Sequence, residues 1–458
     1  MLPPQIALLI WSLLLVLLLR YASPTDGASA RALWVPTTWI IMMASRSPAQ
    51  WLGLVPTSAA TAFEEGSPLD RGFYLVLIGL ALWILARRQF NWRDVFARNA
   101  ALTSFLLFAL ASVVWSDFPF ITFKRWIRDL GGYLMVLVVL SDPRPVDAIS
   151  LVIRRLSYVL LIFSVVFIKY YEYLGIMYDP WTGAPEYIGA TTSKNMLGVL
   201  CLISGLFYFW DIVRRWSERR DRKSRRILYV NFALMAMTLW LLRLSQSATS
   251  QGAFVIGCFI IALVRTKWAT VNPGRVTALI PAGLSAYLIL EFAFDFSTVV
   301  ADFFGRDPTL HGRTGIWNAV LALQTNPLIG VGYQSFWLGD RLTAVWGSLK
   351  TGFLNEAHNG YLEAYLNLGV VGLALLVLFM IVCYRRACKQ LRTSRHFASF
   401  TLGLWTAIVF YNVTEAAFGS SPLWYTLLLC VIDVPRRSHA VMPSYAGQPV
   451  VHRRPTTA

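Results

Sequence analysis

The segment GYLEAYLNLGVVGLALLVLFMIVCY, residues 360–384, decides the fold class. It contains one charged residue, Glu363, near its start, and a basic segment follows directly at Arg385. An α-helix needs about 20 mainly apolar residues to cross the hydrocarbon core of a bilayer. The segment therefore predicts a membrane-spanning helix. The polar residues His358 and Asn359 directly precede its N-terminal end.

Similar apolar runs fill most of the chain. The chain has 458 residues, of which 56% are hydrophobic and 14% are charged, and its mean hydropathy is +0.54. A soluble domain would carry about 25% charged residues. The runs are too long and too uniformly apolar for the strands of a membrane barrel. We therefore predict an all-α polytopic integral membrane protein with about 11–13 transmembrane helices and one large extracytoplasmic loop. The candidate spans are residues 6–20, 33–46, 72–87, 99–115, 129–141, 151–168, 195–211, 227–244, 251–265, 276–296, 360–384, 397–412 and 421–434.

The loops between these runs alternate in charge. Lys and Arg gather in the cytoplasmic loops of membrane proteins, so the basic loops predict the cytoplasmic side and a C-terminus inside. This pattern also explains the net charge of +17 without a nucleic-acid partner. The basic stretches are 87–98, 144–155, 211–226, 265–275, 384–395 and the C-terminal tail. The loops expected outside are 47–71, 116–128, 169–194, 245–250, 297–359 and 413–420.

The longest outer loop divides the chain into four parts. We predict N-terminal transmembrane helices over 1–296, a large periplasmic loop over 297–359 and C-terminal transmembrane helices over 360–434. The polar residues 435–458 predict a disordered cytoplasmic tail. Within the large loop we expect a helix around residues 313–324, entered through Gly312.

Arg313 lies near the start of that expected helix. Free backbone N–H groups and the helix dipole favour an anion there. A guanidinium at this position can hold a phosphate through two parallel hydrogen bonds. The structural alternative is an interfacial arginine that contacts lipid headgroups.

His358 lies at the outer mouth of the span that begins near residue 360, with Asn359 next to it and Glu363 one turn further. A neutral imidazole can accept a proton from an attacking hydroxyl group. The alternative is a histidine that only caps or packs against the helix.

Other polar residues occupy the outer ends of spans. Lys194 and Asn195 stand where an outer loop enters an apolar run, although a lysine there commonly extends to the interface. Arg243 lies near the outer end of its span, where an arginine favours a cavity. Lys124, Arg125 and Arg128 lie in a loop expected outside, where the charge rule predicts few basic residues. They either attract lipid phosphate or lie on an interfacial helix.

Several kinds of chemistry are disfavoured by the absence of their motifs. The chain has no GxxxxGK[ST], GxSxG or HExxH motif, which argues against nucleotide hydrolysis, a serine hydrolase and a zinc protease. The five cysteines form no CxxC pair or evenly spaced framework. We therefore predict no cofactor and no metal ion.

The chain also resembles a known superfamily through motifs that occur in order along it. They are ALWVPTTWIIMMASRSPAQWL (32–52), EEGSPLDR (64–71), WSDFPFITFKRWIRDLGG (115–132), TTSKNMLG (191–198), HGRTGIW (311–317), NPLIGVGYQSFW (326–337) and AHNGYLEAYLNLGVVGL (357–373). With these motifs the chain resembles the O-antigen ligase and polymerase superfamily, in particular its exopolysaccharide-production polymerase-like branch.

The resemblance implies a metal-independent glycosyltransferase of the bacterial inner membrane. Such an enzyme transfers or polymerises glycan from a polyprenyl-diphosphate-linked donor on the periplasmic face, in exopolysaccharide or O-antigen biosynthesis. Arg313 matches the loop arginine that binds the diphosphate, and His358 matches the loop histidine that activates the acceptor. The supporting polar residues would be Asn195, Asn359 and Glu363.

The resemblance also assigns diphosphate contacts to the remaining basic residues. Lys194 and Arg125 match basic positions of the polymerase-like branch. Arg243 corresponds to a second diphosphate arginine, although the chain reads SQSATSQ (245–251) where members often have a Ser-Arg pair.

The expected partners are the lipid-linked donor, membrane lipids, an acceptor and polysaccharide export proteins. The acceptor could be a glycan, a lipid A core or a protein hydroxyl. Two other functions remain open. A transporter or flippase of lipid-linked glycans would favour charges at the membrane midplane and inverted repeats. A non-catalytic scaffold of an export complex would use the loop for docking alone.

Overall fold

The structure, a computed structural model, describes residues 2–22, 27–54, 67–88, 90–179, 183–294, 310–323, 325–349 and 354–435. Almost all of these residues that form regular structure are helical, which confirms the predicted all-α polytopic class. The strands β1 (Ile176–Tyr178) and β2 (Pro185–Tyr187) form a short antiparallel pair. The predicted tail, 435–458, lies outside the described residues except for its first residue.

The helices occur in the order of the predicted spans, with shorter helices between them. The first half contains α1 (Pro4–Ala22), α2 (Gly27–Ala32), α3 (Trp34–Met43), α4 (Pro48–Trp51), α6 (Pro68–Arg87), α7 (Trp92–Arg98), α8 (Ala100–Ala111), α9 (Pro119–Leu140), α10 (Pro145–Tyr170) and α11 (Glu172–Gly175). The second half contains α12 (Lys194–Arg215), α13 (Arg222–Leu244), α14 (Ala248–Arg265), α15 (Lys267–Val271), α16 (Pro273–Phe294), α18 (Leu310–Leu321), α19 (Gly339–Leu349), α20 (Gly360–Thr393), α21 (Arg395–Thr414) and α22 (Pro422–Val431).

Fewer helices qualify as spans than the apolar runs suggest. Among the described residues, eight helices are long and apolar enough to cross a membrane: α1, α6, α10, α12, α13, α14, α20 and α21. A ninth span results if α7 and α8 count as one segment, which bends by 97° at its break. Each of the thirteen predicted ranges falls on a helix, but α3 and α22 have only 10 residues each. Within the described residues, eight or nine of the predicted 11–13 spans therefore have the length and composition of a membrane span.

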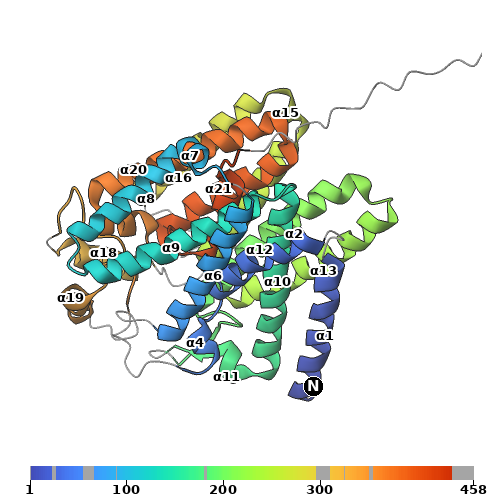
Figure 1. Ribbon diagram of the computed structural model, residues 1–458, viewed down its shortest axis with the longest axis horizontal. Helices are drawn as coiled ribbons and strands as arrows, with labels where there is room; N and C mark the ends of the chain where they lie inside the picture. Colours follow the sequence, from blue (N-terminus) through green and yellow to red (C-terminus); the bar gives the residue numbers. More distant parts are fainter. Residues whose placement is uncertain are drawn as a thin grey trace, which may run out of the picture.

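The core of the helix bundle lies around α10, α12 and α21. In these helices 78%, 78% and 89% of the apolar span is buried inside the protein, compared with 11% in α1. Figure 1 shows α1 at the edge of the bundle, beside α10. The apolar side chains of α1 therefore face the surroundings, as expected for a helix in contact with lipid.

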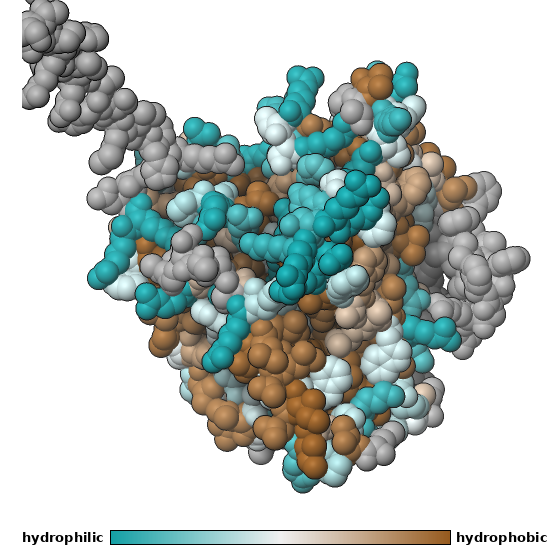
Figure 2. All heavy atoms as spheres, turned by 90° about the vertical axis from the view of Figure 1, so that its right-hand side faces the viewer, coloured by the Kyte–Doolittle hydropathy of each residue, from teal (hydrophilic) through white to brown (hydrophobic). Residues whose placement is uncertain are grey.

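The connecting segments gather on two sides of the bundle. Figure 1 shows α4, α11, α18 and α19, which belong to loops predicted to lie outside, toward the left and the bottom of the view. The short helix α15, from a loop predicted to be cytoplasmic, lies at the upper right. On the face in Figure 2, hydrophilic side chains gather in the upper part and apolar ones predominate below. This separation agrees with the alternation of loop charge.

The span α20 is interrupted at Gly369, which has φ 64° and ψ −167°. Such a break deprives backbone N–H and C=O groups of their helical partners, which is costly near a membrane. The preceding loop supplies new partners. The backbone N–H groups of Val331 and Gly332 in the loop donate to the carbonyl oxygens of Leu366 (3.3 Å) and Asn367 (2.9 Å). In the other direction, the N–H groups of Val370 and Val371 donate to the loop carbonyl oxygens of Pro327 (2.9 Å) and Leu328 (3.1 Å).

Two glycines permit this close contact between the loop and α20. A Cβ atom on Gly330 would lie 2.4 Å from the carbonyl carbon of Asn367, and one on Gly369 would lie 2.2 Å from that of Leu328. Both glycines also have positive φ angles, which other residues adopt at a cost. The motifs around these glycines therefore fix how the outer loop sits on α20.

The cap helix of the large loop begins earlier than predicted. We expected residues 313–324 with Gly312 as the entry, whereas α18 covers Leu310–Leu321 and includes Gly312. Arg313 remains within the first turn of the helix. Residues 297–309, 324 and 350–353 of the large loop lie outside the described residues.

Candidate functional site

Glu415 lies at the centre of a polar cluster that joins four segments of the chain. It follows α21 directly, and its side chain is only 5% exposed. One carboxylate oxygen accepts hydrogen bonds from Arg313 of α18 at 2.7 Å and from Asn195 of α12 at 3.1 Å. The other oxygen lies 3.2 Å from Nδ1 of His358. The predicted residues Arg313, His358 and Asn195 therefore meet on one carboxylate.

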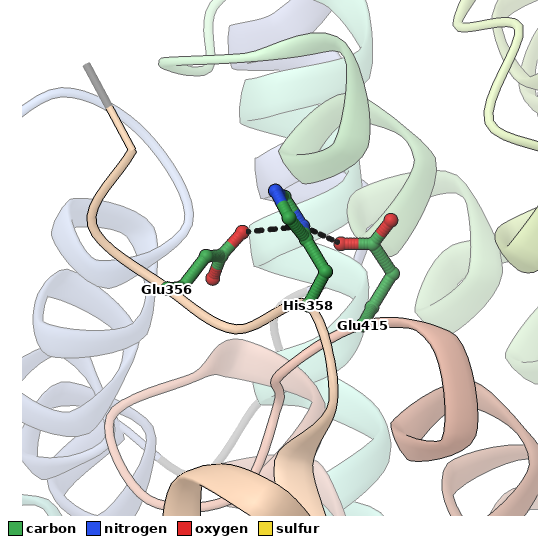
Figure 3. A group of neighbouring side chains, drawn as sticks. All are labelled: Glu356, His358 and Glu415. Atoms are coloured by element: carbon green, nitrogen blue, oxygen red, sulfur yellow. Dashed lines mark hydrogen bonds and ion pairs between the residues drawn. The ribbon is translucent and has the colours of Figure 1, made fainter. Parts of the chain in front are cut away.

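His358 lies between two carboxylates, as Figure 3 shows. Its Nδ1 atom is 3.1 Å from Glu356 and 3.2 Å from Glu415. Burial lowers the pKa of His358, but the hydrogen bonds and negative charges of Glu356 and Glu415 outweigh burial and raise this pKa to about 10. With Nδ1 engaged in this way, Nε2 is the ring nitrogen available for another partner.

The backbone that carries His358 is fixed from both sides. His358 itself has a positive φ of 48°, which is uncommon for a residue with a side chain. The N–H of Ala357 donates to Glu363 at 2.6 Å, and the Ala357 carbonyl accepts from the Trp317 indole at 2.9 Å. Glu363 and Trp317 thus hold the peptide groups next to His358 in place.

The other supporting residue, Asn359, forms the start of α20. Its side-chain oxygen accepts hydrogen bonds from the N–H groups of Tyr361 and Leu362, each at 3.0 Å. Its amide group donates to the carbonyl oxygen of Val413 at 3.1 Å. Asn359 therefore links the start of α20 to the end of α21, two residues before Glu415.

The other predicted basic residues lie around this cluster with separate contacts. Lys194 begins α12 next to Asn195, but its amine is 2.5 Å from Glu186 of β2. Arg125 of α9 donates to the backbone oxygen of Gln334. Arg243 is exposed in the last turn of α13, and no contact described for the cluster includes it. The structure thus places Arg313 and His358 together and leaves the role of Arg243 a prediction.

A cavity of about 260 Å³ opens beside the cluster. Glu356 lies in its wall, so the cavity and His358 share one neighbour. Arg125, Gln334 and Glu363 also line it. The candidate site therefore has a charged centre and an adjoining pocket.

The spacing of Glu356, His358 and Glu415 would also suit a metal ion. Their potential ligand atoms all lie within 4.8 Å of one another. The sequence did not indicate this group, because it brings together residues 57 positions apart. Glu415 is already shared by Arg313 and Asn195. The absence of a metal requirement remains a prediction.

Sequence reasoning did not identify Glu415, Glu356 or Trp317. Glu415 carried one usable signal, because it is the sole acidic residue between Glu363 and Asp433 and falls in a loop predicted to lie outside. A single carboxylate in such an apolar region requires a partner when it is buried. Glu356 and Trp317 carried no distinguishing pattern.

Comparisons with known proteins agree with the resemblance found in the sequence. The family model described as O-Antigen ligase matches residues 233–377. The chain is 28% identical over 328 residues to the "Exopolysaccharide production protein ExoQ" of Rhizobium meliloti (strain 1021), which covers 66% of this chain and 68% of that protein. It is 24% identical over 214 residues to the "Putative polysaccharide ligase RP358" of Rickettsia prowazekii (strain Madrid E), which covers 45% of this chain and 52% of that protein. The chain is thus similar to the O-Antigen ligase family model over residues 233–377 and to these two polysaccharide proteins.

Proposed function

We propose that this chain, which is similar to the O-Antigen ligase family model, is a glycosyltransferase that ligates or polymerises polysaccharide. Its donor is a glycan linked to a polyprenyl diphosphate, and the reaction takes place at the periplasmic face of the bacterial inner membrane. The observation that carries this proposal is the joint binding of Arg313 and His358 to Glu415, which puts a phosphate-binding group beside a proton acceptor.

The proposed step is a displacement at the anomeric carbon of the donor glycan. The oxygen of an acceptor hydroxyl forms a bond to this carbon, and the bond from the carbon to the diphosphate oxygen breaks. The diphosphate leaves with the electron pair, and the configuration at the carbon is inverted. The hydroxyl proton passes to Nε2 of neutral His358.

Arg313 stabilises the leaving group in this scheme. Its guanidinium is 15% exposed and sits in the first turn of α18, where the helix dipole adds to its attraction for an anion. Glu415 holds it in place before the donor arrives. Lys194, Arg125 and Arg243 are proposed as further diphosphate contacts.

Glu356 and Glu415 orient the imidazole and make it a stronger base. A carboxylate on Nδ1 fixes the tautomer and leaves Nε2 to accept a proton, as in other carboxylate–histidine pairs. The raised pKa means that the neutral form is a minor one at neutral pH. That form is correspondingly basic, so its reactivity offsets part of its low population.

The test is an assay with purified protein in liposomes that contain the lipid-linked repeat unit from cells of the His358→Ala strain. We expect wild type to convert this lipid into longer or transferred glycan. His358→Ala and Arg313→Ala should each lose at least about 10²-fold in rate, and Arg313→Lys should keep part of it.

Two substitutions away from the cluster serve as matched controls. Arg98→Ala removes an exposed arginine that pairs with Asp433, and His396→Ala removes a histidine that contacts Arg265. Both variants should transfer glycan at the wild-type rate. Translocation of the lipid without new glycan bonds would instead support a transporter. Full activity of His358→Ala would contradict the proposal, as would activity that requires a divalent cation.

A further inference from the structure

The cavity beside the cluster differs from it in charge, and this difference points to a distinct ligand. Its wall contains one guanidinium, that of Arg125, and two carboxylates, those of Glu356 and Glu363. One guanidinium beside two acidic side chains gives a diphosphate little attraction here, whereas it would meet Arg313 at the cluster. The ligand of the cavity should therefore be neutral and able to donate hydrogen bonds to carboxylate oxygens.

The remaining wall combines flat apolar surfaces with polar side chains. Trp337, Phe418 and Trp424 contribute aromatic rings, while Asn355, Gln334 and Ser420 contribute amide and hydroxyl groups. Aromatic rings pack well against the C–H faces of a sugar ring, and a few placed polar groups fix its orientation. Pure lipid would fit poorly, because an isoprenoid chain would cover the amide of Asn355 without offering it a hydrogen bond.

The cavity is positioned for one particular sugar. Glu356 lines it and also lies 3.1 Å from Nδ1 of His358. A sugar at the Glu356 end of the cavity would thus be separated from the imidazole of His358 by a single side chain. We propose that this cavity is the subsite for the acceptor sugar, which is a neutral, hydroxyl-bearing ring. The inference rests on the proposed function of the neighbouring cluster.

Ala364 offers a way to close the cavity without touching the cluster. Ala364 lies on α20 and lines the cavity, whereas Ala374 of the same helix is exposed on the outside. Ala364→Leu places the same extra atoms into the cavity that Ala374→Leu places on the outer surface. The pair therefore separates occlusion of the cavity from a general effect on α20.

The experiment uses the full-length protein in liposomes with the lipid-linked repeat unit as donor. The soluble acceptor is the repeat oligosaccharide released from its lipid. We expect Ala364→Leu to lower transfer to this acceptor at least ten-fold, while binding of the lipid-linked donor stays within two-fold of wild type. Ala374→Leu should match wild type in both measurements.

A smaller change in the cavity wall tests the subsite even if Ala364→Leu misfolds. Asn355→Ala removes an exposed amide from the cavity wall. It should raise the acceptor KM several-fold and leave kcat and the donor KM unchanged. An unchanged acceptor KM in Asn355→Ala, or transfer by folded Ala364→Leu at the rate of Ala374→Leu, would overturn the subsite. Failure of wild type to consume the donor at all would instead contradict the proposed function.

Discussion

The indole nitrogen of Trp317 donates a hydrogen bond to the carbonyl oxygen of Ala357 at 2.9 Å. Trp317 lies one helical turn after Arg313 on α18, and Ala357 immediately precedes His358. The bond therefore sets the spacing between the guanidinium and the imidazole of the candidate site, which belong to different segments.

Replacement of Trp317 by Phe should slow glycan transfer while leaving the protein inserted. Phe keeps the apolar ring but removes the donor, and a single hydrogen bond is worth about 1 kcal/mol, which corresponds to roughly five-fold in rate. The measurement is turnover of the lipid-linked donor in liposomes. Trp83→Phe is the control, because Trp83 is 53% exposed on α6. Equal rates in both variants would show that the bond does not position the site.

Substitution of Glu415 by Gln should separate binding from turnover. The amide keeps the size of the side chain but removes the charge that holds Arg313 and His358. We expect turnover to fall by about 10²-fold, since both groups lose their orientation. Donor binding should stay the same or become tighter, because the diphosphate no longer competes with a carboxylate for Arg313. Asp433→Asn, which removes an exposed partner of Arg98, should change neither quantity.

The rate of transfer should rise with pH from 7 to about 10. His358 must be neutral to accept a proton, and its neighbouring carboxylates raise its pKa to about 10. Glu356→Gln removes one of these carboxylates, so the rise should shift to lower pH. A pH–rate profile of both proteins tests this. A wild-type rate that falls over this range would assign His358 a role as a cation instead.

The same pKa shift predicts a change in stability. The pKa of His358 in the folded protein lies above its ordinary value of 6.5, so its protonated form is stabilised by folding. This contribution is complete below pH 6.5 and is lost as pH rises through about 10. Thermal unfolding in detergent at pH 7 and pH 10.5 should therefore show a larger drop for wild type than for His358→Gln.

A β-carbon at position 369 should destabilise the protein. In Gly369→Ala the new atom would lie 2.2 Å from the carbonyl carbon of Leu328, and the residue would keep a φ angle of 64°. Conformational strain alone costs about 1–3 kcal/mol. Gly79→Ala on α6 is the control, since nothing lies within 4 Å of its added atom. Equal unfolding temperatures of the two variants would contradict the tight fit of loop and helix.

The sequence predicted the membrane class and singled out Arg313 and His358 as candidates, because both depend on local patterns. Apolar runs of membrane length identify helices, and Arg313 and His358 were recognised from a helix start and a span mouth. Glu415 could not be found in this way, because its partners Arg313 and His358 are 102 and 57 residues away. Such contacts depend on how helices pack.

Fewer of the described helices have the length and composition of a span than the apolar runs suggested, for a related reason. The apolar residues of α3 and α22 form helices of only 10 residues. Hydropathy reports whether a segment avoids water, but it does not report whether the helix continues long enough to cross a bilayer. The interruption of α20 at Gly369 was hidden as well, because glycines inside an apolar run fit both straight and broken helices.

The broken backbone of α20 has a consequence for how the protein is made. The loop that completes the hydrogen bonds of residues 366–371 precedes α20 in the chain, so it is synthesised before this helix. Until the loop folds back, α20 enters the bilayer with exposed polar groups near its outer end. The final structure of α20 and the folding of the preceding loop are therefore coupled during biogenesis.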